Sequence, residues 1–133
     1  MISWFEKHNR LSLLITILIA GIIFYMSSQT FESGIGSGGI GFKAIAYHLI
    51  IFFFLAFFLS ISLIRGKYKN FILIAIILSI LYGISDEIHQ HFVPGRVSSL
   101  SDILLNSFGI VFASTLYLIS LEYRIKKHSR PSL

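Results

Sequence analysis

The most informative segment of the chain is Phe71–Arg96, FILIAIILSILYGISDEIHQHFVPGR. Its first half is almost entirely apolar, whereas its second half holds two carboxylates, two histidines and an arginine. Charged side chains beside a long apolar run are costly in a membrane unless they pair, face a wet cavity or carry a function. Because proline cannot extend a helix and glycine permits a turn, Pro94-Gly95 predicts that the helix ends near His91. The stretch therefore predicts a membrane-crossing helix that ends in a cluster of polar groups.

The composition of the whole chain agrees with a membrane location. Of its 133 residues, 55% are hydrophobic and 13% are charged, and the mean hydropathy is +0.81. A soluble domain of this length would leave much of that apolar surface in water, because small domains bury only part of their surface. The absence of cysteine excludes disulfides and thiolate metal sites. The net charge of +5 is distributed as a membrane-orientation signal, so we expect no nucleic-acid partner.

Four apolar runs predict an all-α membrane protein with four transmembrane helices. Each run has roughly the 20 residues that a helix needs to cross the hydrocarbon core. A signal peptide is the alternative for the first run, but that run lacks an A-x-A-type cleavage site and is longer than a usual signal-peptide core. We expect a single domain over residues 1–133, with residues 1–10 as a polar interfacial anchor. The predicted spans cover about residues 11–28, 44–64, 71–91 and 102–121.

The connecting segments carry weaker signals. Residues 30–43 form a glycine-rich loop with G-x-G-x-x-G spacing, but no strand precedes it, so a dinucleotide site is not predicted. The sequence Ser99-Leu100-Ser101-Asp102 has the form of a capping box and predicts the start of the fourth helix. Residues 122–133 are basic, and we expect a frayed surface segment there.

The distribution of Lys and Arg predicts the orientation in the membrane. The N-terminal lead, the turn at residues 65–70 and the C-terminal tail together carry nine, whereas the other two loops carry one each, Lys43 and Arg96. Because cytoplasmic segments are enriched in basic residues, both termini should be cytoplasmic and the polar cluster should face outward.

This orientation brings polar residues from all four helices to the outer face. At 3.6 residues per turn, Asp86 and Gln90 lie in one stripe with small residues on the third helix, and Asp102 and Asn106 lie in another on the fourth. Stripes that mix small and polar residues are typical of faces that pack against another transmembrane helix. The convergence predicts a functional site, whose candidate residues are Ser28, His48, Asp86, Glu87, His89, Gln90, Arg96, Asp102 and Asn106.

Several of these residues also have structural explanations, which the sequence leaves open. Arg96 with a carboxylate of the third helix would hold the 92–101 loop as an ion pair. Asp102 would stabilise the N-terminus of its helix through the macrodipole. Gln90 and Asn106 would hydrogen-bond between helices, and His48 would be a packing residue.

A metal site is not predicted from the sequence. Glu87 lies near His89 and His91, but there is no H-E-x-x-H spacing and no evident third ligand. We accordingly expect no cofactor.

The chain resembles the VanZ-like membrane proteins. The resemblance rests on Glu87-x-x-Gln90-x-Phe92-x-Pro94-Gly95-Arg96 and Asp102-x-x-x-Asn106-x-x-Gly109, and extends to Tyr25–Gln29 and His48. It implies a multi-pass membrane protein of a prokaryotic cell, with a link to the envelope and to low-level resistance to the glycopeptide teicoplanin. It implies no reaction.

Three functional hypotheses follow. In the first, the outward pocket binds an envelope lipid headgroup or an amphipathic antibiotic, with Arg96 holding a phosphate or carboxylate. In the second, the protein is an enzyme acting on a lipid-linked substrate, with Asp86 or Glu87 as general base and His48 or His89 as its acid partner. In the third, the polar cluster only locks the helices of a structural or oligomeric subunit. Self-association is compatible with all three.

Overall fold

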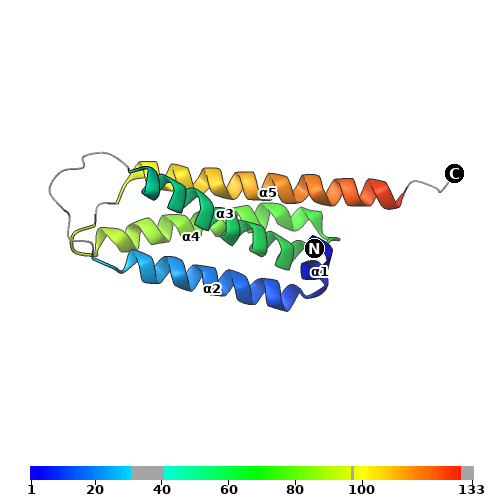
Figure 1. Ribbon diagram of the computed structural model, residues 1–133, viewed down its shortest axis with the longest axis horizontal. Helices are drawn as coiled ribbons and strands as arrows, with labels where there is room; N and C mark the ends of the chain where they lie inside the picture. Colours follow the sequence, from blue (N-terminus) through cyan, green and yellow to red (C-terminus); the bar gives the residue numbers. More distant parts are fainter. Residues whose placement is uncertain (31–40, 97, 130–133) are drawn as a thin grey trace.

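The computed structural model describes residues 1–30, 41–96 and 98–129, which form a bundle of four long helices. These are α2 (Asn9–Ser27), α3 (Phe42–Ile64), α4 (Ile72–His91) and α5 (Leu100–His128), with a short α1 (Ile2–Lys7) and a 3₁₀ turn, η1 (Lys69–Phe71). Successive long helices run in opposite directions, so the N-terminus and the end of α5 lie at the same end of the bundle (Figure 1). The described residues contain no strand, and the predicted all-α fold is confirmed.

The outer surface of the bundle is apolar. Each of the four long helices is long and apolar enough to cross a bilayer. Each helix carries large apolar side chains that are well exposed. One example from each, with 56–62% of the residue's surface accessible, is Ile17, Ile50, Leu73 and Phe112. Apolar surface on this scale is stable only against lipid or another protein. The chain is therefore a multi-pass membrane protein.

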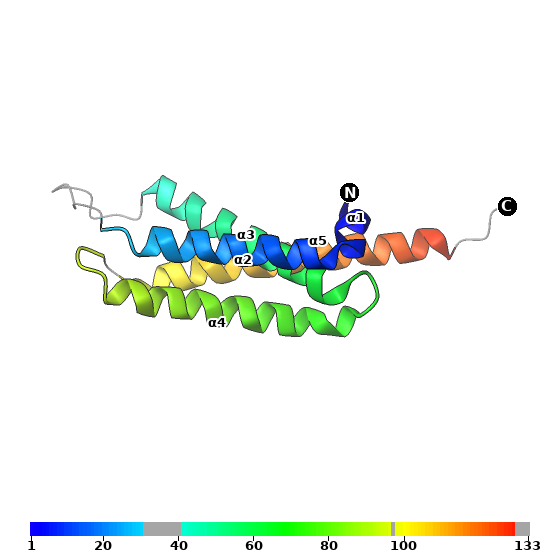
Figure 2. The ribbon, with the colours of Figure 1, turned by 90° about the horizontal axis from the view of Figure 1, so that it is seen from below.

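Helix α3 is the element that connects the bundle. It packs against each of the other long helices, most extensively against α5, and it crosses them obliquely (Figure 2). Where α3 meets α5, the two backbones approach closely, because a Cβ on Gly109 would lie only 2.5 Å from the carbonyl oxygen of Leu49. A side chain on residue 109 would push the two helices apart, so the glycine permits this crossing.

Two buried apolar clusters fill the interior, and the small and polar stripes face inward beside them. The cluster nearer the polar end contains Ile23, Phe52, Leu55, Ala56, Ile110 and Ala113, and the other contains Ile61, Ile64, Tyr117 and Leu121. On each helix, residues spaced three or four apart form the inward-facing stripe. The buried ones are Ser79, Gly83, Asp86 and Gln90 on α4, and Asn106, Gly109, Ala113 and Tyr117 on α5. Helical spacing thus predicted these inward faces correctly.

An ion pair between Glu6 and Arg124 closes the end of the bundle that carries the termini. Nη1 of Arg124 lies 2.6 Å from Oε2 of Glu6 and Nη2 lies 2.8 Å from Oε1, while the Tyr117 hydroxyl donates to Oε1 at 2.6 Å. Burial raises the pKa of Glu6, but the hydrogen bonds from Arg124 and Tyr117 and the positive charge of Arg124 outweigh it, so the pKa is lowered overall.

The described parts of the two ends of the chain are more ordered than the sequence predicted. Residues 122–128 are not frayed, because α5 continues to His128 and is held by Arg124. Residues 2–7, expected only as an interfacial anchor, form α1 and bury Glu6. Residues 130–133 lie outside the described residues.

The connection from α4 to α5 begins with a tight turn. Helix α4 ends at His91, as Pro94-Gly95 predicted, and the N–H of Arg96 donates to the carbonyl of Val93 at 3.1 Å. Gly95 adopts a φ of 79°, which residues with a side chain rarely adopt. This turn places Arg96 beside the end of α2. The G-x-G-x-x-G spacing of the other long connection falls within residues 31–40, outside the described residues.

Candidate functional site

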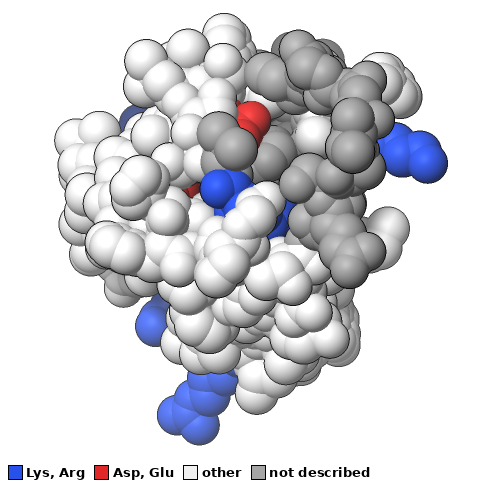
Figure 3. Space-filling model, turned by 90° about the vertical axis from the view of Figure 1, so that its left-hand side faces the viewer, with Lys and Arg blue, Asp and Glu red and all other residues white. Residues whose placement is uncertain are grey.

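Four helix ends meet at the end of the bundle opposite the termini: the C-terminal ends of α2 and α4 and the N-terminal ends of α3 and α5 (Figure 1). Figure 3 views this end and shows acidic and basic atoms close together near the middle of the face, with further basic side chains at its edges. The residues selected from the sequence lie at this end, but they do not form one cluster. The structure separates them into groups with different neighbours.

The first group joins α2 to α4 through Asp86. The Ser27 hydroxyl donates to Oδ1 of Asp86 at 2.5 Å, and Nε2 of Gln90 donates to Oδ2 at 2.9 Å. Nε2 of Gln90 also lies 3.3 Å from the Ser27 hydroxyl oxygen. All three side chains are buried. Both carboxylate oxygens of Asp86 therefore have hydrogen-bond donors, as expected for a group that holds helices together.

Arg96 contacts the end of α2. Its Nε donates to the carbonyl of Gln29 at 3.0 Å, and its Nη2 donates to the carbonyl of Met26. The last carbonyls of a helix lack partners within it and carry partial negative charge, so a guanidinium stabilises them. Arg96 thus contributes to the structure of this end while it also lines a cavity.

His89 of α4 lies against α2, whereas the other candidate histidine, His48 of α3, lies against α5. Nε2 of His89 lies 3.0 Å from the Ser28 hydroxyl oxygen, and its ring stacks on Phe24 with centroids 4.7 Å apart. These contacts anchor α4 to the last turn of α2. His89 and Ser28 therefore meet each other rather than the group that contains Glu87.

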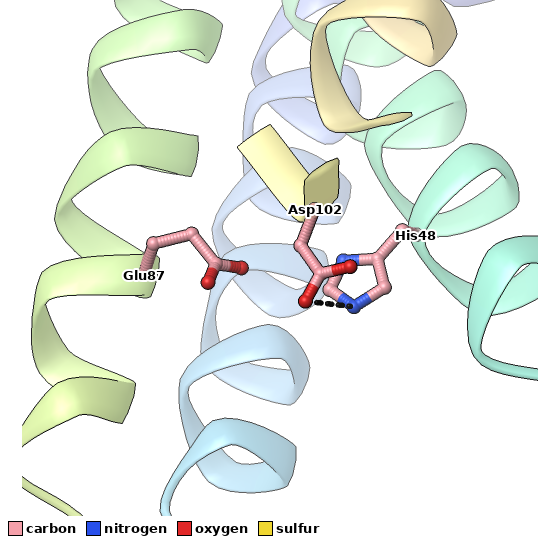
Figure 4. A group of neighbouring side chains, drawn as sticks. All are labelled: His48, Glu87 and Asp102. Carbon is pink, nitrogen blue, oxygen red and sulfur yellow. Dashed lines mark ion pairs between the residues drawn. The ribbon is translucent and has the colours of Figure 1, made fainter. Parts of the chain in front are cut away.

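The last group contains His48, Glu87 and Asp102, from α3, α4 and α5, whose side chains point toward one another (Figure 4). Nε2 of His48 lies 4.0 Å from Oδ2 of Asp102, and one ligand atom from each residue lies within 4.8 Å of the other two. On the other side of its ring, Nδ1 of His48 lies 2.9 Å from Oδ1 of Asn106. This group brings together residues that are far apart in sequence.

The capping of α5 explains why Asp102 is available to this group. Ser99 is the N-cap, and its hydroxyl oxygen accepts from the N–H of Ser101 at 3.1 Å. In a capping box the acidic residue would accept from the N–H of the N-cap residue. Here that N–H donates to Oε2 of Glu87 at 3.3 Å instead, while Asp102 faces His48. The predicted N-cap is confirmed, but its partner comes from α4.

Two cavities open beside these groups. One, of about 310 Å³, is lined by residues of α2, α3, α4 and the following turn: Met26, Ser27, Lys43, Ala44, Tyr47, His48, Gln90 and Arg96. The other, of about 290 Å³, lies between α4 and α5 and includes Glu87, His91 and Ser99 in its wall. The group of His48, Glu87 and Asp102 contributes one residue to each cavity.

Three residues of this region were not among the candidates chosen from the sequence. Ser27, Lys43 and Tyr47 line the first cavity, and Ser27 also binds Asp86. The serine pair that ends the first helix was a usable signal, as was the position of Lys43 at the start of the second. Tyr47 gave no signal of its own, because an aromatic residue in an apolar helix usually only packs.

Comparison with known proteins gives one match. The model of the VanZ/LLP1 family matches residues 12–121, a range that includes every candidate residue named above. The searches of curated proteins and of solved structures find no match. Since the family model covers most of the sequence, the chain belongs to the VanZ/LLP1 family.

Proposed function

We propose that the protein binds the anionic headgroup of an envelope lipid in the 310 Å³ cavity between α2, α3 and α4. The observation that carries this proposal is the meeting of Lys43 and Arg96 in the wall of one cavity. Ammonium and guanidinium groups are the usual protein donors to phosphate and carboxylate oxygens. Tyr47 adds a buried hydroxyl without a hydrogen-bond partner within the described part of the chain.

The size of the cavity favours a headgroup over a whole antibiotic. Sites for drug-sized ligands usually measure ~300–1,000 Å³, and this cavity of about 310 Å³ is at the small end of that range. A phosphate with its glycerol or sugar substituent fits such a volume, whereas a glycopeptide does not. The acyl chains of the lipid would remain in the surrounding bilayer.

Family membership supports a link between this role and resistance. The resemblance to VanZ-like proteins supports an envelope function connected with teicoplanin, and binding of envelope lipids would alter the surface that the antibiotic meets. The proposal requires the cavity to open on the outer side of a prokaryotic cell membrane. The distribution of Lys and Arg predicts this orientation.

Native mass spectrometry of the purified protein tests the binding step. We expect phosphatidylglycerol to remain bound in preference to phosphatidylcholine, and Lys43→Gln to reduce its retention several-fold. Lys69→Gln is the matched control, because Lys69 is exposed at the opposite end of the bundle. Equal retention of the two lipids, or equal loss in both variants, would reject the proposal. Teicoplanin susceptibility of cells producing the same proteins then tests the link to resistance.

A second candidate, a membrane-embedded enzyme, draws support from the grouping of His48 with Glu87 and Asp102. Imidazole and carboxylate groups are the most common general acids and bases. Asp86 and His89, the other catalytic candidates from the sequence, are engaged with Ser27, Gln90 and Ser28. Incubation with envelope lipids followed by mass spectrometry separates the two functions, because only the enzyme would form a new product.

A further inference from the structure

The group of His48, Glu87 and Asp102 has the composition of a metal site. One imidazole nitrogen and two carboxylates, each from a different helix, point toward a common centre (Figure 4). His48 and Glu87 are buried, and Asp102 is partly buried. Two carboxylates so close together repel each other and lose hydration, and a bound cation would offset both costs.

Asn106 orients His48 for this role. Because a carbonyl oxygen only accepts hydrogen bonds, Oδ1 of Asn106 at 2.9 Å selects the tautomer of His48 that carries its proton on Nδ1. The lone pair of Nε2 then faces Asp102 and Glu87. Metal-binding histidines commonly have such a partner on the other ring nitrogen, and it fixes both tautomer and ring orientation.

Glu87 supplies an independent observation that points to a ligand at this position. Its side chain is nearly fully buried, with 3% exposure, and Oε1 has no hydrogen-bond partner among the described residues. The N–H of Ser99 binds the other oxygen, Oε2. A buried carboxylate oxygen without a partner is expensive, so a group that binds it would stabilise this arrangement.

The geometry is close to that of a bound ion. Three atoms that all lie within 4.8 Å of one another share a point no more than about 2.8 Å from each. Zinc–nitrogen and zinc–oxygen bonds are ~2.0–2.2 Å long. Each ligand atom would therefore move by less than about 1 Å to coordinate an ion. Such movement is within the reach of side-chain rotations.

We propose that His48, Glu87 and Asp102 bind one divalent transition-metal ion, with Asn106 as the positioning partner of His48. A mixed set of one imidazole and two carboxylates suits Zn²⁺ or Mn²⁺ better than Mg²⁺ or Ca²⁺, which prefer oxygen ligands alone. Three protein ligands leave a coordination position open, and the two cavities adjoin the group at His48 and Glu87. The site does not depend on lipid binding and is tested separately from it.

Metal uptake by the purified, untagged protein provides the test. The protein in detergent is stripped with EDTA, dialysed against ZnCl₂ or MnCl₂, and its metal content measured by mass spectrometry. We expect one ion per chain, and an affinity at least about tenfold weaker in each of His48→Gln, Glu87→Gln and Asp102→Asn. Asn106→Leu should weaken binding roughly 10–100-fold, as loss of a partner of a metal-binding histidine does.

Matched controls make the result specific. Glu122→Gln repeats the Glu→Gln change at an exposed residue near the other end of α5. His89→Gln repeats the His→Gln change at a histidine outside the group. Both should bind metal as the wild type does. Gel filtration and circular dichroism identify variants that fail to fold, and X-ray absorption of the zinc-loaded wild type should then show one imidazole with oxygen ligands. No uptake by the wild type, or equal uptake by all variants, would overturn the proposal.

Discussion

The hydroxyl of Ser27, the last residue of α2, donates a 2.5 Å hydrogen bond to Oδ1 of Asp86 on α4. Helices α2 and α4 pack against each other much less than either packs against α3. The hydrogen bond therefore joins two helices that pack only sparsely against each other, and both of its side chains are buried. Among helices surrounded by lipid, polar contacts of this kind select the pairing.

Ser27→Ala should destabilise the protein. The substitution leaves Oδ1 of Asp86 without its short donor, and a buried acceptor deprived of its partner costs ~1–3 kcal/mol. The transition temperature of the detergent-purified protein measures the effect. Ser85→Ala is the control, because Ser85 is exposed and its hydroxyl donates to the carbonyl of Tyr82 in the same helix. Equal transition temperatures for Ser27→Ala and the wild type would contradict this role.

Glu6→Gln should also lower the transition temperature. It removes the charge that receives two hydrogen bonds from Arg124 and one from Tyr117. Hydrogen bonds that involve a charged group contribute ~1.5–3 kcal/mol, so a loss of about 2 kcal/mol is expected. Glu122→Gln, at an exposed position of the same helix as Arg124, should have little effect. A similar loss in both variants would point to a general effect of charge.

The contribution of Glu6 should depend on pH with a definite sign. Its pKa in the folded protein is lowered from 4.5, so the folded state binds the proton more weakly than the unfolded state. The stabilisation is therefore complete above about pH 4.5 and is lost as the pH falls through the folded pKa. Thermal unfolding of the wild type and Glu6→Gln between pH 3 and 7 should show transition temperatures that differ at neutral pH and converge in acid. A difference independent of pH would contradict the prediction.

Gly109→Ala should be more damaging than its size suggests. The added Cβ would lie 2.5 Å from the Leu49 carbonyl oxygen and 3.2 Å from the Phe53 nitrogen, and these are backbone atoms that cannot rotate away. Overpacking of this kind costs ~1–3 kcal/mol. Gly21→Ala is the matched control, because a Cβ there meets nothing within 4 Å. If the two alanine variants were equally stable, the close approach of α3 and α5 would not be required.

Labelling of single introduced cysteines tests the predicted orientation. The wild-type sequence contains no cysteine, so each variant has one labelling site. Thr30→Cys and Ser101→Cys lie at the end with the candidate site, and Lys69→Cys and Ser129→Cys lie at the other end, all at exposed positions. A membrane-impermeant maleimide added to intact cells should label the first two and not the others. The reverse pattern would place the candidate site in the cytoplasm.

The sequence predicted the fold and the gathering of polar residues at one end of the bundle, because both depend on simple quantities. Apolar runs of about 20 residues define the helices, and alternation of the helices then gathers residues such as His48, Glu87 and Asp102 at one end. The contacts between individual side chains were not predictable in this way. They depend on which helix lies beside which, and on how each is rotated about its axis.

Asp86 and Glu87 illustrate the difference. Neighbouring residues on a helix point about 100° apart, so Asp86 faces Ser27 of α2 while Glu87 faces Asp102 and the start of α5. The sequence showed two adjacent carboxylates near one arginine and offered an ion pair with Arg96 as the structural alternative. Rotation of α4 gives the two carboxylates separate hydrogen-bond partners.

The pairing of Glu6 with Arg124 has a consequence for biosynthesis. The two residues are 118 positions apart, and at ~5–20 residues per second the ribosome takes roughly 6–24 s to add the second after the first. During that interval neither Arg124 nor the helix that carries it is available to Glu6. The amino-terminal helix can pack on α2 and α3 earlier, but its buried carboxylate acquires these partners only after the final span has been made.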